Sequence, residues 1–231
     1  MLRSLFLSVC VLPSMTAAPC LAQGGVQLSL EGTSGPHGAL MELSVTAIDT
    51  KSSEPQSVQV ELSLYVAART SSSDLLAILN NRIQAAGIAT VLPTTDKRLA
   101  SLFVSDATRV RSRVGGDFEL TITTSEGPPT WIRLERPARW ESVSTLRIAA
   151  VGRSSVDGRT GMSKLTLELD AKANAPSVSN ALHKQAGALG WLSDRPELSS
   201  WRPLRVGDGL LVVGCSVSVS SADPWWLDIS L

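Results

Sequence analysis

Cysteine and histidine are scarce in this chain, and their scarcity excludes several kinds of site. Of three cysteines, Cys10 and Cys20 lie in an N-terminal stretch typical of an export signal, so Cys215 is left alone and no disulfide can form within the exported chain. The two histidines, His37 and His183, have no cysteine or histidine neighbour at metal-ligand spacing. We therefore expect no metal site and no cofactor.

An excess of charge of one sign and long apolar runs are also missing. The formal net charge is +0, so the chain as a whole has no field that would attract nucleic acid or an anionic membrane. No segment approaches the roughly 20 apolar residues that a membrane-spanning helix requires. The sequence predicts neither a nucleic-acid partner nor a transmembrane segment, and it leaves a protein partner, a polysaccharide and an oligomer open.

Motifs for common catalytic chemistry are absent as well. The chain contains no Gly-x-Ser-x-Gly nucleophile turn and no Gly-x-Gly-x-x-Gly or Walker-type phosphate loop. Two carboxylate pairs have the composition of a hydrolase site, Asp157 with Asp170 and Asp194 with Glu197, but acidic pairs of this kind are common in loops. No residue is assigned a catalytic role, and we expect a protein that is not an enzyme.

The first 22 residues are typical of a cleaved export signal. A basic start, an apolar core at Leu5–Leu12 and a small-residue end at Cys20–Ala22 predict a signal peptide over residues 1–22 and a mature chain that begins at Gln23. A proline directly before Cys20 departs from the pattern of lipid-modified cysteines and favours cleavage over lipidation. The protein is therefore expected in the periplasm, in the medium or on the cell surface.

What the sequence does contain is one pattern of segments that occurs twice. Residues 23–127 and 128–231 each start with strand-like segments, continue into a long alternating segment, and then carry one helix and further strands. The matched segments are Val26–Leu30 with Trp131–Glu135, Leu43–Ile48 with Leu146–Val151, and Val58–Val66 with Leu165–Ala171. The predicted fold class is α+β, with two tandem modules from an internal duplication, each a mainly antiparallel β-sheet with one packed α-helix.

Each predicted helix has start and stop signals. Serine side chains accept hydrogen bonds at helix starts, and glycine adopts the left-handed conformation in which helices end. The expected signals are Ser72 or Ser73 and Gly87 with Ile88 for the first helix, and Pro176–Ser177 and Gly190 with Trp191 for the second. The expected apolar stripes are Leu75, Leu76, Ile78, Leu79 and Ile83 in the first helix, and Val178, Ala181, Leu182 and Leu189 in the second.

The first helix and the strand after it resemble a known family. Ser71–Ile88 followed by the strand-like Arg98–Asp106 is similar to the small insert module of flagellins and flagellar hook-associated proteins. In that family a strand, a helix and two further strands build outward-facing domains. The resemblance implies a structural, non-enzymatic surface module.

Three arginines form a basic stripe along one predicted strand. Arg109, Arg111 and Arg113 alternate with Val110 and Val114, so the arginines share one face of the strand. Such a stripe can contact an anionic polymer. The alternative is a solvated strand face balanced by nearby acids, or a strand edge protected by charge. We favour this alternative because acidic residues outnumber basic ones in the first module.

Tryptophan is the dominant aromatic residue, with six copies against three phenylalanines and one tyrosine. When the two modules are aligned, four tryptophans fall on apolar positions of the first module and are expected in the core: Trp131, Trp191, Trp201 and Trp225. Trp226 falls on the position of Glu119, so we expect it to face solvent or a partner.

The same alignment places Leu211, Val213 and Cys215 on one apolar face of a strand. Such a face must be covered, and we therefore expect Cys215 to be unreactive.

These observations predict an exported structural or binding protein of the periplasm or cell surface. Its candidate contact residues are Trp226, Arg109, Arg111 and Arg113. A carbohydrate-binding or adhesive module that uses the tryptophans of the second module is the alternative, and an exported hydrolase is the third hypothesis. Exposed tryptophans beside a concave patch would favour the second, and a buried acidic pair in a cleft would favour the third.

Overall fold

The computed structural model describes residues 24–49, 54–95, 99–125, 127–136, 143–170, 172–220 and 225–231. The predicted signal peptide, its cleavage site and Trp140 lie outside the described residues. The described part forms strands β1–β14 and helices α1 and α2, and its strand pairings are antiparallel throughout. Neither described helix is long and apolar enough to cross a membrane.

The strands form two sheets, a large one and a small one. The large sheet has nine strands, in the order β10 (Thr160–Leu169), β9 (Ser144–Arg153), β13 (Leu210–Ser220), β7 (Glu119–Thr124), β1 (Gly25–Glu31), β5 (Leu99–Ser105) and β4 (Thr90–Thr95), with β12 (Arg202–Val206) on β13 and β11 (Leu192–Asp194) on β12. The small sheet has five strands, in the order β3 (Gln56–Val66), β2 (Ala39–Asp49), β6 (Ala107–Val114), β14 (Trp226–Ser230) and β8 (Trp131–Glu135).

Each sheet contains strands from both predicted modules. In the large sheet β7 pairs with β13, and in the small sheet β6 pairs with β14. The expectation of one sheet for each module is therefore wrong, because strands far apart in the sequence complete each other's sheets. The β-rich, antiparallel character with two helices is confirmed. Both ranges have the same order of elements, namely three strands, a helix and four strands.

The inner faces of the two sheets meet in one hydrophobic cluster. Because successive side chains of a strand point to opposite faces, every second residue reaches this cluster. Leu28 and Ile122 of the large sheet and Val45 and Val110 of the small sheet have no exposed surface. Of the tryptophans predicted in the core, Trp201, Trp191 and Trp225 are buried there.

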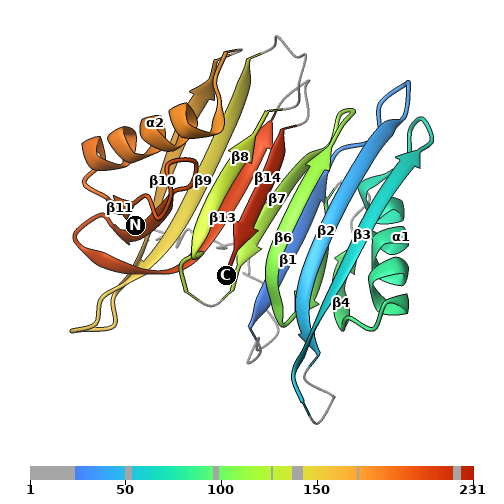
Figure 1. The fold of residues 1–231 in the computed structure, drawn as a ribbon, viewed down its shortest axis with the longest axis horizontal. Helices are drawn as coiled ribbons and strands as arrows, with labels where there is room; N and C mark the ends of the chain where they lie inside the picture. The colour runs from blue at the N-terminus through green and yellow to red at the C-terminus, as the bar shows by residue number, and fades with distance from the viewer. Residues whose placement is uncertain are drawn as a thin grey trace, which may run out of the picture.

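The two helices lie at opposite ends of the molecule (Figure 1). Helix α1 (Ser72–Ala85) contacts β4 and β5 of the large sheet and β3 of the small sheet. Helix α2 (Ala175–Ala188) contacts β10 and β11 of the large sheet and β8 of the small sheet. Each helix therefore spans the two sheet edges at its end of the core.

Both helices are capped by a side chain that precedes the predicted ones, by one position in α1 and by two in α2. Ser71, and not Ser72 or Ser73, caps α1, and its Oγ accepts a hydrogen bond from the backbone N–H of Asp74 at 3.2 Å. Ser72 is instead fully buried. Asn174 caps α2, and its side chain and backbone exchange hydrogen bonds with Ser177, three positions later.

Both helices end at the predicted glycines. Gly87 has φ of 90° and Gly190 has φ of 72°, a region that favours glycine because it has no Cβ. The residue after each glycine, Ile88 and Trp191, is buried and donates its backbone N–H back into the last turn. The stripes are narrower than predicted: Ile78 and Leu189 are exposed, because neither points toward a sheet edge.

Strand β13 changes face at a bulge. Its pairing with β9 shifts between Val212 and Gly214, so Val212 and Cys215 both face the core. The prediction that Leu211, Val213 and Cys215 share one face is wrong for this reason, and Leu211 is exposed. The predicted burial of Cys215 is confirmed, and burial raises the pKa of its thiol to about 12.

Candidate binding site

The outer face of the small sheet brings together the candidate residues from the sequence. Strand register places outward side chains side by side in three rows across β3, β2, β6, β14 and β8. The rows are Ser63, Glu42, Arg113, Trp226 and Glu135; Glu61, Ser44, Arg111, Asp228 and Arg133; and Gln59, Thr46, Arg109, Ser230 and Trp131. The predicted arginine stripe on β6 therefore lies next to Trp226 on β14, although more than 100 residues separate them in the chain.

Every arginine of this face has a carboxylate partner. The pairs are Arg109 with Asp228 at 2.6 Å, Arg111 with Glu135 at 2.8 Å, Arg113 with Glu42, and Arg133 with Glu197. Opposite charges this close cancel each other's field beyond a few ångströms. This is the balanced strand face favoured from the sequence, and it gives an anionic polymer little net attraction.

The pair formed by Arg109 and Asp228 contains the most buried carboxylate of the four. Nε and Nη2 of Arg109 donate to the two carboxylate oxygens of Asp228 at 2.9 and 2.6 Å, and Asp228 is only 1% exposed. These hydrogen bonds raise the pKa of Arg109 above its ordinary value. A carboxylate buried to this extent depends on its bidentate partner for compensation.

The tryptophans of this face are in contact with the arginines. Trp226 is half-buried, and the Cζ atoms of Arg111 and Arg113 lie 4.5 and 4.9 Å from its ring centroid. Trp226 therefore faces outward, as predicted. Trp131 was predicted in the core, and that is wrong: it is half-buried on the outer face, where Arg109 lies over its ring. The reason is that Ile132 and Leu134 take the inward positions of β8.

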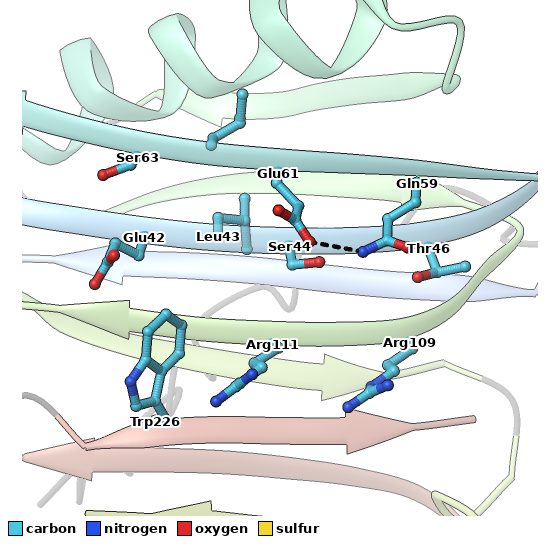
Figure 2. A pocket seen from close by; sticks show the side chains of 11 residues that line it. Glu42, Leu43, Ser44, Thr46, Gln59, Glu61, Ser63, Arg109, Arg111 and Trp226 are labelled. Carbon is cyan, nitrogen blue, oxygen red and sulfur yellow. Dashed lines mark hydrogen bonds between the residues drawn. The ribbon is translucent and has the colours of Figure 1, made fainter. Parts of the chain in front are cut away.

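A groove of about 490 Å³ runs over β2 on this face. Figure 2 shows its floor at Ser44 and Thr46, with Glu61 on one side and Arg111 on the other. Trp226 and Glu42 stand at one end, as the same view shows. The walls are on β3 and β6, which are two strand spacings apart, or roughly 10 Å. The volume lies in the range of small-molecule sites.

The two walls of the groove have opposite character. Gln59 and Glu61 project from β3, and Nε2 of Gln59 donates to Oε1 of Glu61 at 2.9 Å. Glu61 is exposed and is in no ion pair among the described residues. Opposite it, Arg109 and Arg111 each have five N–H donors, of which the ion pairs use only some. The groove thus offers acceptors on one side and donors on the other.

The β2 and β3 half of this groove was not predicted from the sequence. Glu61, Gln59 and Ser44 are ordinary polar residues of two alternating strands, and nothing in their spacing marks a site. Their outward positions on neighbouring strands were the available signal. Register between β2, β3 and β6 was needed to bring them opposite the arginines.

The outer face of the large sheet is chemically plain. Its centre carries mostly small polar side chains, with Phe103 beside Gln27: Gln27, Ser29, Ser101, Thr121, Thr123, Ser216 and Ser218. Several bond to one another, as Thr123 does with Ser216 at 2.9 Å. An ion pair on this face joins Arg147, which is exposed, to Glu119, which is half-buried, at 2.8 Å.

The alternative chemistry considered from the sequence finds little support in the geometry. Asp194 receives two hydrogen bonds from Arg202, and Glu197 pairs with Arg133, so each member of that acidic pair has an arginine. Hydrogen bonds from Ser154 and from a backbone N–H lower the pKa of Asp157, which is fully exposed. In the part of the chain that the structure describes, no group of histidine, cysteine and acidic residues is placed to hold a metal ion.

No family model, no curated protein and no solved structure matches this chain. The similarity of residues 71–106 to the flagellin insert module therefore remains a resemblance of sequence pattern. The structure places the described part of this segment in α1, β4 and β5, which close one end of the core. Its helix does not reach the groove.

Proposed function

We propose that this is an exported, non-catalytic binding protein of the periplasm or cell surface, and that it holds its ligand in the groove over β2. The supporting observation is the contrast between the two outer faces. Both sheets bury their inner faces in the same core, and the large sheet does so with serine and threonine outside. The arginines, tryptophans and carboxylates of the small sheet are therefore not required by the fold.

Direct binding to cell envelopes tests this proposal. The groove variant replaces Gln59 and Glu61 by alanine, and the matched control replaces Thr166 and Glu168, which are equally exposed on β10, the edge strand of the large sheet. We expect the purified full chain to bind envelopes of the organism that encodes it. The groove variant should weaken that binding by about tenfold or more, and the control should not. Equal loss in both variants, or in neither, contradicts the proposal.

We also propose that residues 23–127 and 128–231 arose by duplication. Three observations support this: the same order of elements, the same glycine helix ends, and the reciprocal pairing of β7 with β13 and β14 with β6. If the two ranges are equivalent, a second molecule of residues 23–127 can replace residues 128–231. Its β6 then occupies the place of β13, and its β7 the place of β14.

The isolated range 23–127 tests this equivalence. Without residues 128–231, β6 and β7 each lose one strand partner, and the core residues that pack against the second range become exposed. We expect it to fold as a homodimer that pairs β6 of each copy with β7 of the other, with a midpoint of unfolding that rises with protein concentration. Sedimentation and denaturant titration measure both properties. A folded monomer would instead support independent modules, and a disordered fragment would contradict the equivalence.

A further inference from the structure

We infer that the ligand of this groove is an uncharged, linear oligosaccharide that lies along β2, between the arginine wall and the Glu61 wall. The inference rests on the proposed function and names the chemical class of the ligand. It follows from three properties of the groove: its paired charges, its donors opposite acceptors, and the absence of free backbone groups at its floor.

The pairing of charges argues against an ionic ligand. Each of the four arginines of this face has its own carboxylate partner, and a fifth carboxylate, Glu61, is in no ion pair among the described residues. A polyanion would meet Glu61 at one wall, and a polycation would meet the two arginines at the other. Either would place like charges together, which is unfavourable.

The saturated backbone of the floor argues against an extended peptide. Strand β2 is paired along Ala39–Asp49 with β3 and along Met41–Ala47 with β6. A peptide strand gains its affinity mainly by main-chain hydrogen bonds to a free sheet edge. Over β2 no such edge exists, so a ligand in the groove must be recognised by side chains.

Sugar hydroxyls fit what the side chains offer, because each hydroxyl is both a donor and an acceptor. They can accept from the guanidinium groups of Arg109 and Arg111 and donate to Glu61 and Gln59 across the groove. Ser44 and Thr46 add hydroxyls at the floor. Trp226 stands at one end, and the exposed part of its half-buried ring can pack on the apolar face of a sugar ring.

Calorimetric titration of the full chain with defined hexasaccharides tests the inference. The neutral probes are cellohexaose, chitohexaose and maltohexaose, and the charged probe is a hexamer of galacturonic acid. We expect at least one neutral probe to bind and the charged probe not to bind. Glu61→Gln and Trp226→Ala should each weaken the neutral probe by about tenfold or more, because a buried sugar hydroxyl or ring face loses its partner.

Two control variants separate a groove effect from a general loss of structure. Glu168→Gln changes a similarly exposed glutamate on the large sheet. Met162→Ala removes an exposed apolar side chain from the outer face of the large sheet, far from the residues that line the groove. Both controls should bind the neutral probe as the unaltered chain does.

The remaining outcomes separate this inference from the proposed function. Binding of the galacturonic acid hexamer that depends on Glu61 or Trp226 overturns the neutral-sugar inference and leaves groove binding intact. The neutral-sugar inference is also overturned if none of the three neutral probes binds while envelope binding still depends on Gln59 and Glu61. If neither the probes nor the envelopes respond to the groove residues, both the inference and the proposed function are wrong.

Discussion

The outer faces of the two sheets differ in chemistry although their inner faces share one core. On the large sheet, the centre of the outer face is built from serine, threonine and glutamine, several of which bond to one another. On the small sheet, the corresponding surface carries arginines stacked on tryptophans and paired with carboxylates, beside a groove. The difference shows which side chains the fold requires and which it does not.

A buried carboxylate makes the same point. Asp228 is only 1% exposed, although it lies on the outer face of its sheet. On the outer face of the large sheet, uncharged side chains such as Thr121 and Ser218 occupy such positions. Burying an ionised group is unfavourable unless it is paired and hydrogen-bonded. Its bidentate contact with Arg109 holds that arginine at the edge of the groove. We interpret the pair as a support for the groove wall.

The largest expected effect separates the core from the outer face. Trp201 has no exposed surface, and Trp201→Ala should lower the free energy of unfolding by about 3–5 kcal/mol, because it leaves a large cavity in the shared core. Trp226→Ala should cost less than about 3 kcal/mol, since its ring is half-buried against two guanidinium groups. Urea titration measures both. If Trp226→Ala lowers the free energy of unfolding by more than about 3 kcal/mol and leaves binding unchanged, Trp226 is only a packing residue.

A smaller effect compares matched ion pairs on the two faces. Arg109→Ala leaves the buried Asp228 carboxylate without its partner and should destabilise the protein by about 1–3 kcal/mol. Arg147→Ala removes an exposed pair on the large sheet and should cost less than about 0.5 kcal/mol. The same titration measures both variants. Equal losses of unfolding free energy in Arg109→Ala and Arg147→Ala would mean that the ion pairs of the two faces do not differ in their contribution to stability.

The last effect, which is negligible at neutral pH, tests the assignment of faces on β13. Because burial raises the pKa of the Cys215 thiol to about 12, the folded chain keeps its proton where the unfolded chain loses it. The free energy of unfolding does not depend on this thiol below about pH 8.5. As the pH rises from there toward 12, the free energy of unfolding falls by at most about 1.4 kcal/mol per pH unit. Cys215→Ala should remove that slope, measured as the free energy of unfolding at several pH values. Rapid labelling of Cys215 by a thiol reagent in the folded chain would place it on the outer face.

Local patterns made much of the fold predictable from the sequence. Period-two alternation indicated β2, β3 and β10, and the glycines at Gly87 and Gly190 marked both helix ends. These signals depend on neighbouring residues only. The partition of strands between two mixed sheets depends on contacts between distant segments, such as β7 with β13, and no local pattern encodes it.

The candidate site was predictable in part for the same reason. Alternation placed Arg109, Arg111 and Arg113 on one face, and alignment of the repeats placed Trp226 outward. Trp131 was misplaced because the alignment could not fix its register within a single residue. A shift of one position moves a side chain to the other face of a strand.

The contrast between a binding face and a plain face is tested most directly by hydroxyl-radical footprinting of the full chain. The chain is oxidised once alone and once in the presence of a saturating amount of cell envelopes. Trp226 beside the groove and Met162, exposed on the outer face of the large sheet, are oxidisable side chains that report on the two surfaces. We expect the oxidation rate of Trp226 to fall several-fold on binding and that of Met162 to stay unchanged. Protection of Met162 with Trp226 unaffected would contradict the account, because the plain face would then be the one that binds.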